Sequence, residues 1–166
     1  MNKAPDYLLQ NAARMGRNFD IFREKDCHYD CLYEDRSRDD LAAVAPYLVT
    51  VADGKDLWSW VTESGFGNSW GIFMNAAAGF EDILNHFRKF VVVKTANGGE
   101  QYFRFYDPRV LKVFLPACNE SQVIDFFGPV ESFIAEGSIK EEAIEYRHQN
   151  GVLQQKKVEN ARAFSI

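Results

Sequence analysis

The polar residues that could do chemistry in this sequence lie mainly in one short segment, FRFYDPRVL, at residues 103–111. It brings Arg104, Asp107 and Arg109 close together, so that one carboxylate lies between two guanidinium groups. His86 could join them as a general base. One hypothesis is therefore a small hydrolase or phosphodiesterase that uses His86, Asp107 and Arg109.

The same segment also fits a structural role. Asp107 is a favourable N-cap, and Pro108 suits the first position of a helix, where its missing N–H costs nothing. Capping would occupy the carboxylate oxygens with backbone N–H groups. Arg109 would lie in the first helical turn, where the dipole disfavours a cation, so we expect it to have a carboxylate partner. Arg104 should be partly covered and need an acceptor. We favour such an internal clamp over a ligand site.

The other candidate chemical groups give weaker signals. His86 follows Asp82 by four residues, which indicates either an oriented base or, as we favour, a surface pair on a helix. Cys27 and Cys31 would share one strand face but lie about 13 Å apart, too far for a single zinc ion. The sequence contains no phosphate-binding loop, zinc-protease motif or nucleophile elbow. We therefore predict no metal and no cofactor.

Aromatic residues near the arginines favour contact with another protein. Tyr102 and Tyr106 are expected on the same hairpin face as Arg104, and Trp58 should lie off the inner face of its helix. Tryptophan, tyrosine and arginine dominate the binding energy of protein interfaces. The candidate partner-binding residues are Trp58, Tyr102, Arg104, Tyr106 and Arg109. The alternative is that each aromatic side chain belongs to the core.

Composition limits the class of protein. The 166 residues are 46% apolar and 14% aromatic, enough for one domain with a buried core. A formal charge of −5 argues against a nucleic-acid-binding surface. No segment approaches the roughly 20 apolar residues that span a bilayer, and the first residues do not resemble a signal peptide. Three cysteines, an odd number, fit reduced thiols. We expect a cytoplasmic protein with no nucleic-acid or membrane partner.

The hydrophobic pattern predicts an α/β or α+β domain. We expect a mixed, partly antiparallel sheet of about five or six strands, flanked by helices. The predicted strands lie at residues 7–9, 27–33, 47–51 and 70–74, with a hairpin at 90–106. The predicted helices lie at residues 18–25, 57–64, 80–89, 108–115 and 119–127.

The hairpin is the clearest local feature. Asn97-Gly98 lies between two apolar runs and predicts a two-residue type I′ turn. That turn would place Val92 opposite Phe103 and make part of the main sheet antiparallel.

The last part of the chain has a different pattern. Ser138-x-x-Glu141 resembles a capping box, and Asn150-Gly151 is interpreted as the end of the helix that it begins. The chain is therefore divided into a domain at residues 1–136 and a short C-terminal helical tail at residues 137–166.

Six motifs follow one another along the chain. They are APYLV, WSWV, SGFGNSWGIFM, ILNHFRKF, YFRFYDPRVLKVFLP and FFGPV, at residues 45–49, 58–61, 64–74, 83–90, 102–116 and 126–130. Their order resembles that of the effector-chaperone, or adaptor, family of the type VI secretion system, over about residues 7–134. The FRFYDPRVL and GxxWGIF blocks are specific in combination.

The resemblance implies a non-enzymatic protein. It would bind one toxin effector in the cytoplasm of the producing cell, stabilise it and help load it onto the VgrG spike. The implied partners are the effector, which can contain a PAAR domain, and VgrG. The family's signature positions correspond here to Trp70, Gly71, His86, Arg88, Arg104, Tyr106, Asp107, Pro108, Arg109, Gly128 and Pro129. An immunity-type inhibitor of a toxin is an alternative, because acidic charge fits inhibition of a nuclease.

Overall fold

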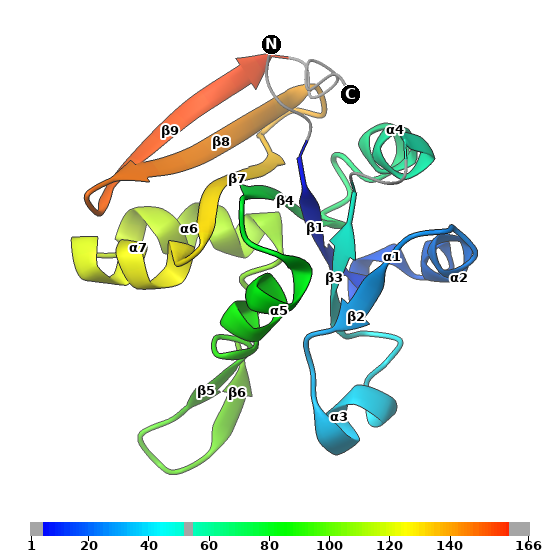
Figure 1. Ribbon diagram of the computed structural model, residues 1–166, viewed down its shortest axis with the longest axis horizontal. Coiled ribbons are helices and arrows are strands. Elements are labelled where there is room, and N and C mark those ends of the chain that lie inside the picture. Colours follow the sequence, from blue (N-terminus) through cyan, green and yellow to red (C-terminus); the bar gives the residue numbers. More distant parts are fainter. Residues whose placement is uncertain (1–4, 52–54, 160–166) are drawn as a thin grey trace.

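The computed structural model describes residues 5–51 and 55–159, and its centre is one antiparallel sheet (Figure 1). The strand order is β2-β3-β1-β4-β7-β8-β9. The strands are β1 (Tyr7–Asn11), β2 (Tyr29–Cys31), β3 (Pro46–Thr50), β4 (Gly71–Ala76), β7 (Val130–Glu136), β8 (Glu142–Gln149) and β9 (Val152–Glu159). The α+β class is confirmed. The sheet is larger than expected, with seven strands. All the pairs of adjacent strands in the described residues are antiparallel, whereas a mixed sheet was expected.

Helices cover both faces of this sheet (Figure 1). One side holds α5 (Phe80–Arg88), α6 (Pro108–Ala117) and α7 (Glu120–Phe127), and the other holds α1 (Ala12–Met15), α2 (Asn18–Arg23) and α4 (Lys55–Ser64). The short helix α3 (Asp35–Asp40) lies beyond the end of β2. The five predicted helices correspond to α2, α4, α5, α6 and α7, while α1 and α3 were not predicted.

Because helices cover both faces of the sheet, the central strands are apolar on both sides. Leu8 and Leu9 of β1 are both buried, as are Leu48 and Val49 of β3, although successive side chains point to opposite faces. A strand covered on both sides has no solvent face and therefore reads as a continuous apolar run.

Phenylalanine rings fill the space between the sheet and α5–α7. The ring of Phe126 on α7 lies 5.4 Å from the rings of Phe105 and Phe133, and Phe87 on α5 lies 5.4 Å from Phe105. Each buried Phe contributes about 1.5–3 kcal/mol through loss of exposed apolar surface. Phe105 thereby anchors the segment that leads out of the hairpin.

The hairpin differs from the prediction in both register and position. Its strands β5 (Val92–Lys94) and β6 (Glu100–Tyr102) pair Val92 with Tyr102, one residue away from the expected register. The loop is longer than two residues: the N–H of Gly98 donates to Thr95 O at 3.0 Å, and Gly98 adopts φ +78°. The hairpin forms its own two-stranded sheet and projects from the domain (Figure 1).

The predicted helical tail is wrong. Residues 142–159 form β8 and β9, which extend the main sheet from β7. Asn150 and Gly151 adopt φ +51° and +86°, the values of a type I′ turn, and Gln149 pairs with Val152 across it. Tyr146 is fully buried, which secures β8 to the core. The division of the chain at residue 136 stays a prediction.

Candidate protein-interaction site

Asp107 and Arg109 form the internal clamp that the sequence predicts. The Asp107 carboxylate accepts from the backbone N–H of Arg109 at 2.9 Å, and from its Nε at 3.0 Å and Nη2 at 2.6 Å. Burial raises the pKa of Asp107, but the hydrogen bonds and charge of Arg109 outweigh burial, so the net pKa is lowered. The carboxylate therefore stays ionised at neutral pH and caps α6. Pro108 occupies the first helical position.

Three tyrosines and an arginine meet at the base of the hairpin, and we call them the tyrosine–arginine cluster: Tyr33, Tyr102, Arg104 and Tyr106. The hydroxyls of Tyr33 and Tyr106 lie 3.4 Å apart, and the ring of Tyr102 lies 4.8 Å from that of Tyr33. Burial raises the pKa of Tyr106, while a hydrogen bond and the charge of Arg104 oppose the rise. The cluster joins the hairpin to the segment after β2.

Exposure divides the predicted partner-binding residues into two groups. Tyr102 is 47% exposed, the side chain of Arg109 is 54% exposed, and Arg104 is also exposed rather than partly covered as expected. Trp58 is only 5% exposed and packs edge-on against Phe73, at 4.8 Å between ring centroids. Tyr106 is buried as well. The expectation that Trp58 lies off the inner face of its helix is wrong, because α4 presents that side chain to the sheet.

His86 is a buried structural residue. Its Nε2 donates to Phe126 O at 2.8 Å, and burial lowers the pKa of the imidazole, which favours the neutral form. The predicted surface pair with Asp82 is therefore wrong. Gly128 lies against the ring: a Cβ at this position would come within 2.2 Å of His86 Cε1, and φ is +49°. His86 and Gly128 thus fit each other, and β7 begins just after the neighbouring Pro129.

Arg88 secures the edge strand β2. Its Nη2 donates to Cys31 O at 2.9 Å and lies 3.5 Å from Asp30 Oδ2, while Nη1 lies 3.7 Å from Glu34 Oε1. Asp30 also pairs with Arg38 at 2.8 Å. This signature position therefore ties the end of α5 to the sheet.

Packing also explains the residue types at Trp70 and Gly71. The ring of Trp70 packs 5.0 Å from that of Trp60. A Cβ on Gly71 would lie 2.1 Å from Leu9 O, so the backbone of β1 excludes every larger residue there.

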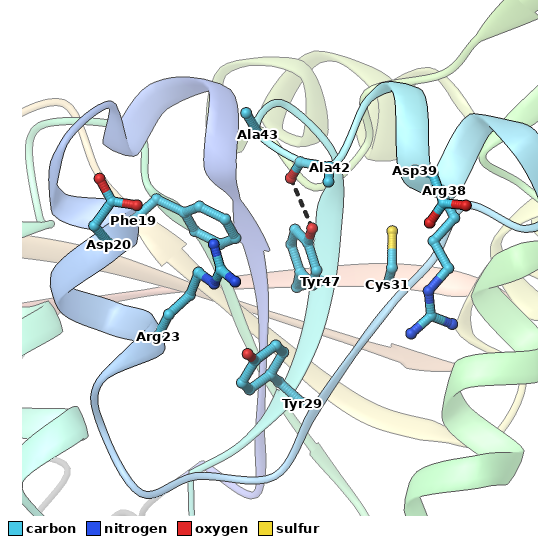
Figure 2. Close-up of a pocket in the computed structure, with 10 residues that line it drawn as sticks. All are labelled: Phe19, Asp20, Arg23, Tyr29, Cys31, Arg38, Asp39, Ala42, Ala43 and Tyr47. Atoms are coloured by element: carbon cyan, nitrogen blue, oxygen red, sulfur yellow. Dashed lines mark hydrogen bonds between the residues drawn. The ribbon is translucent and has the colours of Figure 1, made fainter.

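A pocket of about 350 Å³ opens between α2 and α3 (Figure 2). Tyr29, Cys31 and Tyr47 come from the strands beneath it, and Arg23 and Arg38 lie on opposite sides (Figure 2). Its remaining lining residues are Phe19, Asp20, Asp39, Ala42 and Ala43. The arginines could hold an anionic group over the aromatic rings, although two aspartates balance their charge. Burial raises the pKa of the Cys31 thiol, which makes it a poor nucleophile.

Neither the α2–α3 pocket nor a second hollow on β8 and β9 is lined by His86, Asp107 or Arg109. Within residues 5–51 and 55–159, no three His, Cys, Asp or Glu side chains are placed to hold a metal ion.

Comparison with known families identifies the scaffold. The family model described as a domain of unknown function (DUF4123) matches residues 7–124. The chain belongs to the DUF4123 family. This family is associated with type VI secretion, in agreement with the resemblance seen in the sequence. Searches of curated proteins and of solved structures gave no significant match.

The DUF4123 match covers the clamp and the tyrosine–arginine cluster but ends inside α7. It therefore stops short of β7, β8 and β9. None of the helices in the described part of the chain has the length and apolar character needed to cross a bilayer.

Proposed function

We propose that this DUF4123 protein is a non-enzymatic adaptor for a type VI secretion toxin. It binds one cognate effector in the cytoplasm of the producing cell, stabilises it and helps load it onto the VgrG spike, with a PAAR-containing effector as one form of that cargo. The observation that carries the proposal is membership of a secretion-associated family over residues 7–124.

The contacts of the candidate catalytic groups support a non-enzymatic role. His86 donates to a backbone carbonyl in the core, and the carboxylate of Asp107 is occupied by Arg109. A general base needs a free lone pair within hydrogen-bond reach of a substrate proton. Asp107 instead accepts from Arg109 through both carboxylate oxygens, and the His86 ring is only 7% exposed, which limits access of a substrate to it.

The projecting hairpin supports a role in binding another protein. Val92, Val93 and Tyr102 are exposed on its two short strands, and Arg104 lies exposed at its base. An isolated two-stranded hairpin is only marginally stable in water, and apolar side chains exposed together often mark interaction sites. We therefore place one partner contact on the hairpin, beside the tyrosine–arginine cluster.

Co-expression tests the proposal. The full chain, with an affinity tag, is expressed together with the toxin encoded beside its gene, and the toxin is also expressed alone. An adaptor should co-purify with the toxin and raise its soluble fraction. A toxin that is equally soluble alone and does not co-purify would contradict the proposal. Protection of a target cell by the chain alone would indicate an immunity protein instead.

A further inference from the structure

The two edges of the main sheet are built differently. At the β2 edge, Leu32 N–H donates to Pro46 O and Thr50 N–H donates to His28 O. Because backbone groups alternate in direction along a strand, Tyr29 and Cys31 face away from β3. The outward groups of Cys31 are both occupied: its N–H donates to Asp30 Oδ1 at 2.8 Å, and its carbonyl accepts from Arg88 at 2.9 Å. This edge is closed to a further strand at Cys31.

The β9 edge offers its backbone groups. Gln149 and Val152 are the pair that closes the two-residue turn, so their N–H and C=O groups point at each other. Alternation then directs the backbone groups of Leu153, Gln155 and Lys157 away from β8. In the described part of the chain, β9 has a strand neighbour on one side only. Three residues can therefore pair with an added strand.

A hollow of about 390 Å³ lies over β8 and the edge strand β9. It is lined by Glu145, Arg147, Gln154, Gln155 and Lys156. Arg147 Nη2 lies 2.8 Å from Glu145 Oε1, so that carboxylate already has a guanidinium partner. Lys156 lies opposite Glu145 in the pairing of β8 with β9. The hollow therefore has two positive side chains, Arg147 and Lys156, and one negative side chain, Glu145. The hollow suits a carboxylate from an added strand.

The lysines also limit what can pair there. Charged side chains on an edge strand, lysine above all, discourage pairing between identical sheets. Lys156 and Lys157 are both exposed near the middle of β9. Lys157 Nζ already lies 3.4 Å from Glu142 Oε2, so Lys156 is the residue that would repel a basic strand and attract an acidic one. The β8–β9 hairpin lies outside the family match, which fits a surface specific to this chain's own partner.

We propose that the effector docks on β9 by strand addition. An extended acidic segment of the effector pairs with the outward backbone groups of Leu153, Gln155 and Lys157, and one of its carboxylates enters the hollow beside Lys156. This inference rests on the proposed adaptor function and assigns it a binding mode, in which backbone bonds give affinity and side-chain hollows give specificity.

Site-resolved amide hydrogen exchange on the full chain, free and in complex with the effector, tests the backbone contacts. Exchange of the Leu153, Gln155 and Lys157 amides should slow by about tenfold or more in the complex. The amides of Gln154 and Lys156 point toward β8, so their exchange should be slow in both states. Unchanged exchange at the three outward amides in the complex would overturn the inference. The inference would also be overturned if the free protein is a dimer in which these three amides already exchange slowly, because a second copy of the chain would then occupy the edge.

Two substitutions test the same contacts by affinity. Gln155→Pro removes one outward N–H without touching the β8 ladder, and proline is tolerated on such edges. It should bind the effector about tenfold or more weakly than Gln155→Ala, which keeps the N–H. Lys156→Glu should also weaken binding about tenfold, whereas the matched charge reversal at exposed Lys112 of α6, Lys112→Glu, should not. If Gln155→Pro fails to fold, Lys156→Glu and hydrogen exchange decide.

The outcomes separate the two proposals. If the wild-type chain does not bind the effector, the adaptor function falls and the β9 site falls with it. If the wild type binds and neither Gln155→Pro nor Lys156→Glu binds more weakly than its matched control, only the β9 site falls.

Discussion

The chain makes two hairpins around an Asn-Gly pair, and the two differ in turn, length and surroundings. In β8–β9 both turn residues have positive φ, and the strands of eight residues each join the main sheet. In β5–β6 only Gly98 of the pair has positive φ, and the strands of three residues stand apart. The same dipeptide therefore allows different turns, and the packing of the flanking strands selects between them.

Packing at the turn itself is the clearest contrast. A Cβ on Gly151 would lie 2.7 Å from Glu120 O at the start of α7, while a Cβ on Gly98 would meet nothing within 4 Å. The turn at Gly151 is held by the rest of the domain, whereas the turn at Gly98 depends on its own sequence. We therefore expect the β8–β9 hairpin to belong to the stable core and the β5–β6 hairpin to open locally.

The largest expected effect comes from removing one tyrosine from each hairpin. Tyr146→Ala removes a fully buried ring from β8 and should lower the free energy of unfolding by about 3–5 kcal/mol. Tyr102→Ala removes a ring that is 47% exposed and should cost below about 1 kcal/mol. Urea unfolding of both variants measures the difference. Similar costs would show that the two hairpins are equally part of the core.

Alanine at the two turn glycines should give the next largest difference. Gly98→Ala carries only the strain of positive φ, about 1 kcal/mol. Gly151→Ala carries the same strain and adds the clash with Glu120 O, so we expect about 2–4 kcal/mol in total. Thermal melts of the two variants compare them. A Gly151→Ala variant as stable as Gly98→Ala would place the turn away from α7.

The Asp107–Arg109 clamp, which follows the β5–β6 hairpin, should have a smaller and pH-dependent effect. Asp107→Ala removes the cap of α6 and should cost roughly 1 kcal/mol at neutral pH. Because the pKa of Asp107 is lowered in the folded state, its contribution is present above the unfolded value near 3.8 and disappears as pH falls through the folded pKa. The wild-type and variant unfolding free energies should therefore converge in acid. If the two unfolding free energies still differ below the folded pKa, the stabilisation by Asp107 does not depend on the charge of its carboxylate.

The smallest effect on stability is expected at the exposed part of the tyrosine–arginine cluster. Arg104 is exposed, so Arg104→Ala should change the unfolding free energy by no more than about 0.5 kcal/mol. Combined with Tyr102→Ala, it should weaken effector binding by at least about tenfold if the hairpin contacts the partner. Val113→Ala, at another exposed apolar position, is the control and should bind normally. Pull-down of the effector at equal protein concentration measures the loss.

Local signals in the sequence predicted the features that depend on neighbouring residues. The Asn119–Gln122 capping box is present in α7, and Asp107 caps α6 as expected. The carboxylate partner of Arg109 was inferred from the helix dipole and lies only two residues away. Each of these interactions closes within one helical turn, so its residue types and spacing are visible in the chain.

Features that depend on distant residues were missed. Tyr33 and Tyr106 are separated by 73 positions, so nothing in either segment indicated their contact. The α2–α3 pocket is assembled from two helices, two strands and a loop. Trp58 was placed outside the core because a small rotation of an amphipathic helix changes which side chains are buried. A capping-box match at Ser138 and the Asn150-Gly151 pair suggested a helix between them, although β7 provides a neighbour that favours strands there.

The clasp that Arg88 and Asp30 place on the backbone of Cys31 limits how this molecule can assemble. A sheet that accepts strands at both ends can join copies of itself without limit and form filaments. Here the chain's own side chains occupy the outward backbone groups of Cys31 at the β2 end, so strand pairing is favoured at the β9 end. A complex made by strand pairing is therefore expected to add one strand to each sheet, and a higher protein concentration should not lengthen it into a filament.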